Sequence, residues 1–231
     1  MTNKNLAIIP ARSGSKGLKD KNIKELNGHP LMYYSIKAAV DSGIFDEVMV
    51  STDSEKYKRI AINCGAEVPF LRSEKNANDT ASSWDMVEEV LDNYKKMEKE
   101  FNTICLLQPT SPLRKADDIR QAYDIFFERK ARAVISVCEA EHSLQTYGHL
   151  GLENDMSQFM SRESEGRRQD FETDYRLNGA IYIVDVLSLL QDHFIYGEGS
   201  YAYIMPKERS IDIDTEFDFE LTEFFIKKNK I

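Results

Sequence analysis

A short apolar run near the start of the chain leads directly into a loop with two glycines and many basic side chains. The loop follows the run 8–11 and contains Gly14 and Gly17. Its five basic residues, against one acidic residue, are Arg12, Lys16, Lys19, Lys21 and Lys24. Glycines let the backbone approach a ligand and present N–H groups to it. Because the whole chain carries a net charge of −9, this local excess of positive charge predicts a phosphate-bearing ligand bound at one place.

The spacing of the loop differs from both common glycine-rich nucleotide motifs. A Walker loop needs G-x-x-x-x-G-K-[ST], and a dinucleotide-binding fold needs G-x-G-x-x-G. Gly14 and Gly17 are separated by only Ser15 and Lys16. The sequence therefore disfavours an ATPase and an NAD-dependent enzyme. From local features alone, an ordinary basic surface loop is the simpler alternative.

Two carboxylates near the end of the chain could hold a metal ion. Asp212 and Asp214 alternate with Ile211 and Ile213. If the segment is extended, a period of two places both isoleucines in the core and both carboxylates on the other face, about 6.6 Å apart. A pair at that spacing suits a hydrated Mg²⁺ that also binds a substrate phosphate. The simpler alternative is that Asp214 or Thr215 only caps the last helix.

The same pattern of aspartates also suggests an aspartyl-phosphate phosphatase, with Asp212 as the nucleophile and Asp214 as the acid. That chemistry needs a lysine and further acidic residues on a sheet built downstream of the nucleophile. Only 17 residues follow Asp214 in the 231-residue chain. The position of the motif therefore rules this activity out.

Two further polar segments carry candidate anion-binding groups. The segment 79–83 is typical of a helix start, because Asp, Thr and Ser are good N-caps, and a helix N-terminus is also a natural anion site. Arg168, Arg176 and Asn178 lie in or beside an irregular polar span. A solvated run of charges is the default interpretation there.

Short β-rich runs alternate with segments of helical periodicity, which predicts an α/β fold with a parallel sheet covered on both faces. The predicted strands are 6–9, 47–50, 103–107, 133–137 and 180–184. Apolar stripes at helical spacing run through 84–94 and 119–127, and the last helix is expected to pack through Phe217, Leu221, Phe224 and Phe225. In such sheets ligands bind beyond the carboxyl ends of the strands. The loops 10–22, 51–53 and 108–114 should therefore line one crevice.

The regular alternation stops after Val137. From 139 to 175 the chain is polar and irregular, which is a long span for a compact domain. Disorder, a lid and an arm that packs on another subunit are the three alternatives.

The composition excludes several classes of protein. A pI near 5.1 argues against nucleic-acid binding, which normally needs a basic face. Cys64, Cys105 and Cys138 are odd in number and widely spaced, so they indicate buried apolar groups and neither a disulfide framework nor a zinc site. Because no apolar run approaches the ~18 residues needed to span a bilayer, a cytoplasmic protein is expected.

Six motifs follow one another in a recognisable order: I-P-A-R-x-G-S-K-G at 9–17 with K-N at 21–22, S-T-D at 51–53, D-T-A-S-S at 79–83, L-Q-P-T-S-P-L-R at 107–114, R-x-N-G-A-I-Y at 176–182 and S-I-D-I-D-T at 210–215. Together they resemble the N-acylneuraminate cytidylyltransferases, the CMP-sialic acid synthetases, over essentially the whole chain. The resemblance implies a three-layer, mostly parallel, Rossmann-like nucleotidyltransferase sheet in a single domain, 1–231. It also implies that 139–175 is an inserted arm at the interface of a homodimer.

The resemblance implies a reaction as well. The anomeric hydroxyl of a nonulosonic acid, first of all N-acetylneuraminic acid, attacks the α-phosphorus of CTP with Mg²⁺ as cofactor. A CMP-sugar forms and pyrophosphate leaves. Negative charge builds on the leaving group, so cations placed there lower the barrier. The implied partners are CTP, the sugar acid and a second copy of the chain, with no nucleic acid and no membrane.

Roles follow residue by residue from the same resemblance. The residues implied to bind the nucleotide are Ala11, Arg12, Lys16, Lys21, Asn22, Arg72 and Ser82. Those implied to act in catalysis are Arg12, Lys16, Lys21, Asp212 and Asp214. Asp212 and Asp214 are the implied metal ligands, and Asp212 is the implied acceptor of the hydroxyl proton. The residues implied to bind the sugar are Gln108, Arg168, Arg176, Asn178 and Tyr182. Arg168 is a plausible partner for the sugar carboxylate, because a guanidinium matches its two oxygens.

Two positions depart from the family pattern. Phe194-Ile195-Tyr196 stands where adjacent phenylalanines approach the N-acyl group, and Gln145 stands where a lysine reaches across the dimer. Legionaminic or pseudaminic acid is therefore an alternative acceptor. A nucleotidyltransferase for another sugar or base competes with this interpretation, as does a non-catalytic nucleotide- or sugar-binding protein on the same fold.

Overall fold

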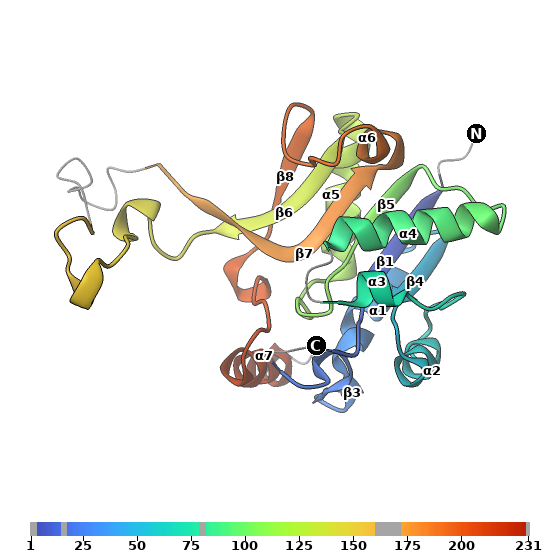
Figure 1. Cartoon of the computed structure of the whole chain (residues 1–231), viewed down its shortest axis with the longest axis horizontal. Helices are drawn as coiled ribbons and strands as arrows, with labels where there is room; N and C mark the ends of the chain where they lie inside the picture. The colour runs from blue at the N-terminus through green and yellow to red at the C-terminus, as the bar shows by residue number, and fades with distance from the viewer. Residues whose placement is uncertain (1–3, 15–17, 79–81, 160–171, 230–231) are drawn as a thin grey trace.

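A six-stranded sheet with helices on both faces dominates the computed structural model, which describes residues 4–14, 18–78, 82–159 and 172–229 (Figure 1). The order across the sheet is β4-β1-β5-β7-β6-β8, with β7 antiparallel to both neighbours and the other pairings parallel. The predicted α/β fold with a mostly parallel sheet is confirmed. The strands are β1 (Asn5–Pro10), β4 (Glu47–Ser51), β5 (Thr103–Leu106), β6 (Ala133–Glu139), β7 (Tyr175–Asp185) and β8 (Ser200–Ile204).

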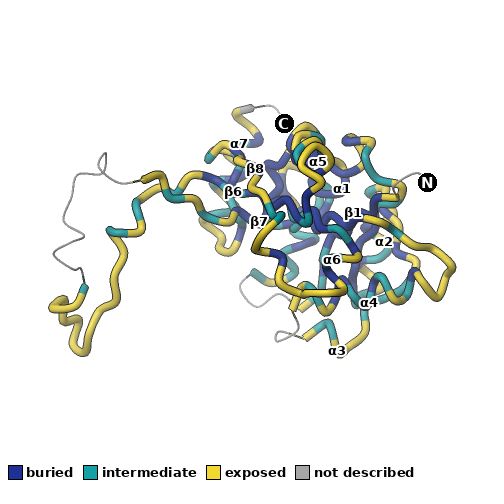
Figure 2. Tube along the Cα trace, turned by 90° about the horizontal axis from the view of Figure 1, so that it is seen from above, coloured by how far each residue is buried: buried dark blue, intermediate teal, exposed yellow. Residues whose placement is uncertain are grey.

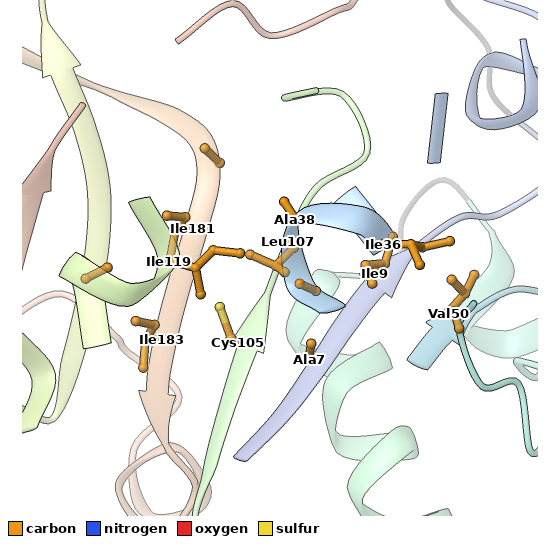
Figure 3. Close-up of a cluster of buried hydrophobic side chains, with 14 of the residues drawn as sticks. Ala7, Ile9, Ile36, Ala38, Val50, Cys105, Leu107, Ile119, Ile181 and Ile183 are labelled. Atoms are coloured by element: carbon orange, nitrogen blue, oxygen red, sulfur yellow. The ribbon is translucent and has the colours of Figure 1, made fainter. Parts of the chain in front are cut away.

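One face of the sheet packs against three helices, α1 (Leu31–Ser42), α2 (Glu55–Asn63) and α5 (Ala116–Glu128). Figure 3 shows Ile36 of α1 and Ile119 of α5 meeting Ile9, Leu107 and Ile181 from three neighbouring strands or strand ends. The apolar stripe predicted for 119–127 is buried as expected, except that Phe127 at its edge is exposed. These contacts fix the sheet from which the loops after β1, β4 and β5 leave at one edge.

The other face packs against α4 (Ser83–Lys96) and α6 (Val186–Gln191), while the single-turn helix α3 (Glu74–Ala77) precedes α4. The fully buried Tyr94 of α4 lies between the rings of Phe70 and Phe101. Because both faces are covered, β1 and β5 are apolar and buried on both sides, which is why they are near-continuous hydrophobic runs in the sequence.

β7 does not run through the sheet without a break. Its pairing with β6 shifts between Ile135 and Val137, so that the residues 178–181 of β7 lie opposite Ser136 alone. Gly179 adopts φ +73, a left-handed conformation that favours glycine. Such a bulge bends the strand and leaves ladder groups that need other partners.

Beyond the break, β6 and β7 continue as a two-stranded ribbon that leaves the sheet and carries an arm (Figure 1). The described part of the arm, 140–159 and 172–174, contains the 3₁₀ turns η2 (Leu144–Thr146) and η3 (Leu152–Asn154). Its surface is mostly exposed along the whole trace (Figure 2). The large apolar side chains that it exposes are Leu144, Tyr147, Leu150, Leu152 and Met156.

A third apolar cluster joins the two ends of the chain. On the N-terminal side it contains Leu26 of β2 (Glu25–Leu26), which pairs with β3 (His29–Pro30) after the 3₁₀ turn η1 (Lys21–Ile23), and on the C-terminal side it contains Phe219 and Ile226 of α7 (Glu216–Asn229). The 3₁₀ turn η6 (Lys207–Arg209) lies on the path from β8 to α7. The fully buried residues Leu26, Leu31 and Ile213 belong to this cluster. The last segment of the chain is therefore fixed beside the first loop.

The face of α7 that packs inward differs from the prediction. Phe219, Thr222 and Ile226 are buried, whereas Phe217 and Phe224 are exposed. Phe219 and Ile226 face the third apolar cluster. At the helix start, Thr215 Oγ1 accepts from the Asp218 N–H at 3.3 Å, and Asp218 Oδ2 accepts from the Thr215 N–H at 2.8 Å. This reciprocal pair has the form of a capping box. The predicted helix is present. Its aromatic residues lie on more than one side, so the sequence did not show which side would pack inward.

No helix in the described part of the chain is both long enough and apolar enough to cross a membrane.

Replacing Phe219 by alanine should release α7 from the first loop. Phe219 is 5% exposed and lies under the Lys24 ammonium at 4.3 Å, whereas Phe217, one half-turn away, is 70% exposed. We expect Phe219→Ala to lower the free energy of unfolding by about 3–5 kcal/mol. The matched variant Phe217→Ala should change it by less than about 0.5 kcal/mol. Urea unfolding followed by circular dichroism measures both, and equal effects of the two changes would contradict the orientation of α7.

Candidate active site

The polar loops predicted to share one edge of the sheet do share it. β1, β4 and β5 are parallel neighbours, so the segments 11–22, 51–53 and 107–114 all leave the same edge. Because β7 is antiparallel, its first residues come to this edge as well. The segment 205–214 follows β8 to the same place, where the Ile213 N–H donates to the Thr110 carbonyl at 2.8 Å. Five segments far apart in the sequence therefore meet.

The basic loop is tied down by the protein at both of its described ends. Ala11 is buried and its N–H donates to the Ser51 carbonyl at 2.9 Å. The Ser13 N–H and hydroxyl donate to the two carboxylate oxygens of Asp53, each at 2.8 Å. The buried Asn22 carboxamide donates to the Arg12 carbonyl at 3.1 Å. Asn22 thus shapes the loop, and Asp53, which sequence reasoning placed in a motif without a role, anchors it.

Arg72 lies over the end of β4 and is largely buried. Its guanidinium donates to the Ser51 hydroxyl at 3.0 Å and to the Ser51 carbonyl at 2.6 Å. Burial lowers the pKa of Arg72 to about 10, with the Asp53 carboxylate opposing that shift. The group stays cationic at neutral pH and stands beside the Ser51–Asp53 corner. Its contact with a nucleotide stays a prediction.

Ser82 begins α4 as its N-cap. Its hydroxyl accepts from the Asp85 N–H at 3.0 Å, and the Asp85 carboxylate accepts from the Ser82 N–H at 3.1 Å. The helix-start interpretation of the 79–83 motif is therefore confirmed for Ser82. An anion-binding role is compatible with it, because helix N-termini favour negative charge.

The two aspartates near the C-terminus occupy unequal surroundings. Asp212 is largely buried and accepts from the Thr110 side chain, while its Oδ1 is buried without a hydrogen-bond partner among the described residues. Burial raises the pKa of Asp212, with a smaller contribution from the Asp214 carboxylate, against the opposing effects of Thr110, Lys21 and Arg176. Asp214 is exposed, so the expectation that both carboxylates share one face holds only in part.

Lys21 connects the basic loop to this pair. Its ammonium donates to the Ile213 carbonyl at 2.6 Å and to Asp214 Oδ1 at 3.1 Å. The Lys21 side chain is 13% exposed, against 75% for Asp214, so the lysine is enclosed. A second ion pair, Lys24 with Glu216, follows beside it. The caps proposed as the alternative use for this motif fall on Thr215 and Asp218, which leaves the carboxylates of Asp212 and Asp214 for other partners.

Asp212 and Asp214 offer carboxylate oxygens that could bind a metal ion. In the part of the chain that is described, no three His, Cys, Asp or Glu side chains gather closely enough to hold an ion by themselves. Two carboxylates could contribute oxygen donors, those of Asp212 and Asp214, and the Oδ1 of Asp212 has no hydrogen-bond partner among the described residues. Mg²⁺ typically binds through one or two carboxylates, water and substrate phosphates. The donor set therefore fits Mg²⁺ shared with a nucleotide better than a permanent metal centre.

The residues predicted to contact the sugar fall into two groups. Gln108, Arg176 and Tyr182 are partly exposed at or near the edge. Arg176 donates to the Ser210 carbonyl at 3.2 Å. Burial raises the pKa of Tyr182 to about 12, so its phenol is neutral, and the ring packs against Trp84 with centroids 6.4 Å apart.

Asn178 requires a correction, because it is 1% exposed. Both ends of its carboxamide bond to buried protein groups, so Asn178 offers a sugar no direct contact. Lys16 and Arg168 lie outside the described residues, as do 79–81 of the helix-start motif.

Arg114 is a further residue that sequence reasoning quoted in a motif without assigning a role. It is fully buried, and burial lowers its pKa to about 10. The guanidinium donates to the Ala180 carbonyl at 2.8 Å and to the Gln108 carbonyl at 3.4 Å. Next to this contact, a Cβ on Gly179 would lie 2.6 Å from Gln108 Oε1. Arg114 therefore holds the loop after β5 against β7, and Gly179 leaves room for the Gln108 side chain.

The chain is similar over nearly its full length to known cytidylyltransferases. The family model described as cytidylyltransferase matches residues 6–221. A pseudaminic acid cytidylyltransferase of Campylobacter jejuni is 34% identical over 226 residues, which cover 98% of this chain and 97% of that protein. An N-acylneuraminate cytidylyltransferase of Escherichia coli is 40% identical over 222 residues, which cover 96% of this chain but 52% of that protein.

The fold has a close counterpart among solved structures. A CMP:2-keto-3-deoxy-manno-octonic acid synthetase complexed with CTP superposes with a TM-score of 0.72 at 16% identity, covering 98% of this chain and 100% of that one. At that identity the likeness concerns the fold. The match of the family model over 6–221 and the 34% identity to the Campylobacter jejuni protein show that the chain belongs to the cytidylyltransferase family.

Proposed function

We propose that this cytidylyltransferase transfers CMP from CTP to the anomeric hydroxyl of a nonulosonic acid and releases pyrophosphate. One observation carries the proposal: Lys21 of the basic loop is held between the Ile213 carbonyl and the Asp214 carboxylate, beside Asp212. Cations suited to a triphosphate and carboxylates suited to a metal ion therefore stand in one place. The names of the two relatives, one for pseudaminic acid and one for an N-acylneuraminate, support the substrate class.

The basic loop would bind the triphosphate. Charge builds on the leaving pyrophosphate in the transition state, and fixed cations there stabilise that state more than the bound substrate. Arg12, Lys16 and Lys21 would supply these cations. Asp53 and Asn22 hold the described residues Arg12 and Ser13 in place through hydrogen bonds.

Asp212 would accept the proton of the attacking hydroxyl. A raised pKa brings a carboxylate closer to the range in which a general base works near neutral pH. Asp212 and Asp214 would also hold Mg²⁺, whose chemistry is to neutralise phosphate charge. Gln108, Arg168, Arg176 and Tyr182 would bind the sugar, with Arg168 on its carboxylate.

An acceptor panel tests the proposal. The purified protein is incubated with CTP, Mg²⁺ and, in separate reactions, N-acetylneuraminic, legionaminic or pseudaminic acid, and pyrophosphate release is measured. We expect release with at least one acid, with N-acetylneuraminic acid tested first. ATP, GTP and UTP in place of CTP are the controls for the base. Binding of CTP by calorimetry without release from any acid would favour a non-catalytic protein and overturn the proposal.

Asp212→Asn should separate activity from stability. Because burial raises the pKa of Asp212, the charged form costs folding free energy, and this cost appears as pH rises above about 4 and is complete above the raised pKa. The variant should therefore unfold at a higher temperature than the wild type at pH 7 and at the same temperature near pH 3. Turnover should fall about 100-fold or more.

Asp214→Asn is the matched control for that experiment. Asp214 is exposed and has an ion pair with Lys21, so its replacement should lower turnover without raising the unfolding temperature. Differential scanning calorimetry at pH 3 and 7, with pyrophosphate release at pH 7, measures both properties. A wild-type rate in Asp212→Asn would sink the assigned role of Asp212.

We also propose that the arm packs against a second copy of the chain. It exposes five large apolar side chains, an unusual number for a solvated segment, and the β6–β7 ribbon holds it away from the sheet. The double variant Leu150→Asp, Leu152→Asp should halve the mass measured by sedimentation equilibrium. Leu187→Asp, an exposed leucine on α6, is the control and should leave the mass unchanged. A monomeric wild-type protein would contradict this proposal.

A further inference from the structure

The break in β7 is filled by one buried serine of the neighbouring strand. Ser136 Oγ accepts from the Ile181 N–H at 2.7 Å and donates to Asn178 Oδ1 at 2.6 Å. Asn178 Oδ1 also accepts from the Ala180 N–H at 3.2 Å. Together with Ser111, which donates to the Asn178 carbonyl at 3.1 Å, and Arg114, which donates to the Ala180 carbonyl, these two side chains satisfy backbone groups that the shifted ladder would leave unpaired.

The other half of the Asn178 carboxamide reaches a third segment. Its Nδ2 donates to Ser210 Oγ at 2.9 Å, and Ser210 Oγ donates in turn to the Pro206 carbonyl at 2.9 Å. Ser136, Asn178 and Ser210 are all buried. A carboxamide can accept from Ser136 and donate to Ser210 at the same time without carrying charge.

This contact fixes one end of the segment that carries Asp212. Ser210 lies two residues before Asp212, and Ile213, which donates to the Thr110 carbonyl at 2.8 Å, lies one residue after it. Arg176 adds a bond to the Ser210 carbonyl at 3.2 Å. Asp212 is therefore held from both sides by buried or part-buried hydrogen bonds, although 210–214 belongs to neither a helix nor a strand.

We propose that Asn178 is a positioning residue, which sets the place of the Asp212 carboxylate through Ser210. The kinetic part of this inference rests on the proposed function, whereas its structural part does not. A displacement of a reacting group by about 1 Å can cost about 100-fold in rate. The bulge in β7 thereby serves the site, because Asn178 lies within it and bonds there to both Ser136 and Ser210.

Ser210→Ala tests the proposal with the least disturbance, since it removes one hydroxyl, and Asn178→Ala is the second variant. Thr103→Val is the matched control, because the Thr103 hydroxyl also makes buried hydrogen bonds, to Asn5 and Tyr123, but at the opposite edge of the sheet. Amide hydrogen exchange without any ligand is measured by mass spectrometry for peptides covering 205–215 and 100–106. The kcat and the KM for CTP are then measured with the best acceptor.

We expect Ser210→Ala and Asn178→Ala to exchange about tenfold faster in 205–215 and not in 100–106, and Thr103→Val to show the reverse. The kcat of the first two should fall about 10- to 100-fold while the KM for CTP changes less than about twofold. Unchanged exchange in 205–215, or faster exchange with an unchanged kcat, would overturn the positioning role. If the wild type turns over no sugar acid, the proposed function fails, yet the exchange measurement still decides whether Asn178 holds this segment.

Discussion

The arrangement of the site depends on the hydrogen-bonded break where β7 lies opposite Ser136. A regular strand from 175 to 185 would satisfy its own N–H and C=O groups and would give its neighbours nothing to bind. The bulge at 178–181 instead turns the chain, and the Asn178 carboxamide ties together β6, β7 and the segment that carries Asp212. The same bend sends the β6–β7 ribbon outward into the arm and leaves room at Gly179 for the Gln108 side chain.

Electrostatic contacts set positions at this site more than they stabilise the fold. The pairs of Lys21 with Asp214 and of Lys24 with Glu216 join the first loop to the last segment, but exposed ion pairs typically contribute only about 0–1 kcal/mol each. The apolar cluster of Leu26, Leu31 and Ile213 provides the stabilisation beneath them. Asp212 instead lowers the stability of the fold, because its burial costs free energy that the surrounding cations only partly offset. Such a cost is typical of a group kept for chemistry.

The local sequence pattern predicted the structure correctly wherever one physical rule dominated. Buried strands covered on both faces read as apolar runs, and the carboxyl-end rule brought three loops to one edge. Two predictions depended on contacts that no local pattern encodes. The side of α7 that packs inward followed from contacts with Leu26 and Leu31, which are distant in the chain, since its aromatic residues offer more than one apolar face. Asn178 looked like a polar group in a loop motif, but the antiparallel course of β7 buried it.

The sequence by itself determined the type of fold, the basic loop, the carboxylate pair and the family resemblance, because each is carried by residue types at fixed local spacing. Tertiary structure decided which of those groups meet and which are enclosed. Lys21 faces Asp214 across 193 positions of sequence, and Asp212 differs from Asp214 in its burial and in its hydrogen bond from Thr110. Such differences arise from how the segments pack, since desolvation and hydrogen bonding depend on neighbours that are distant in the chain.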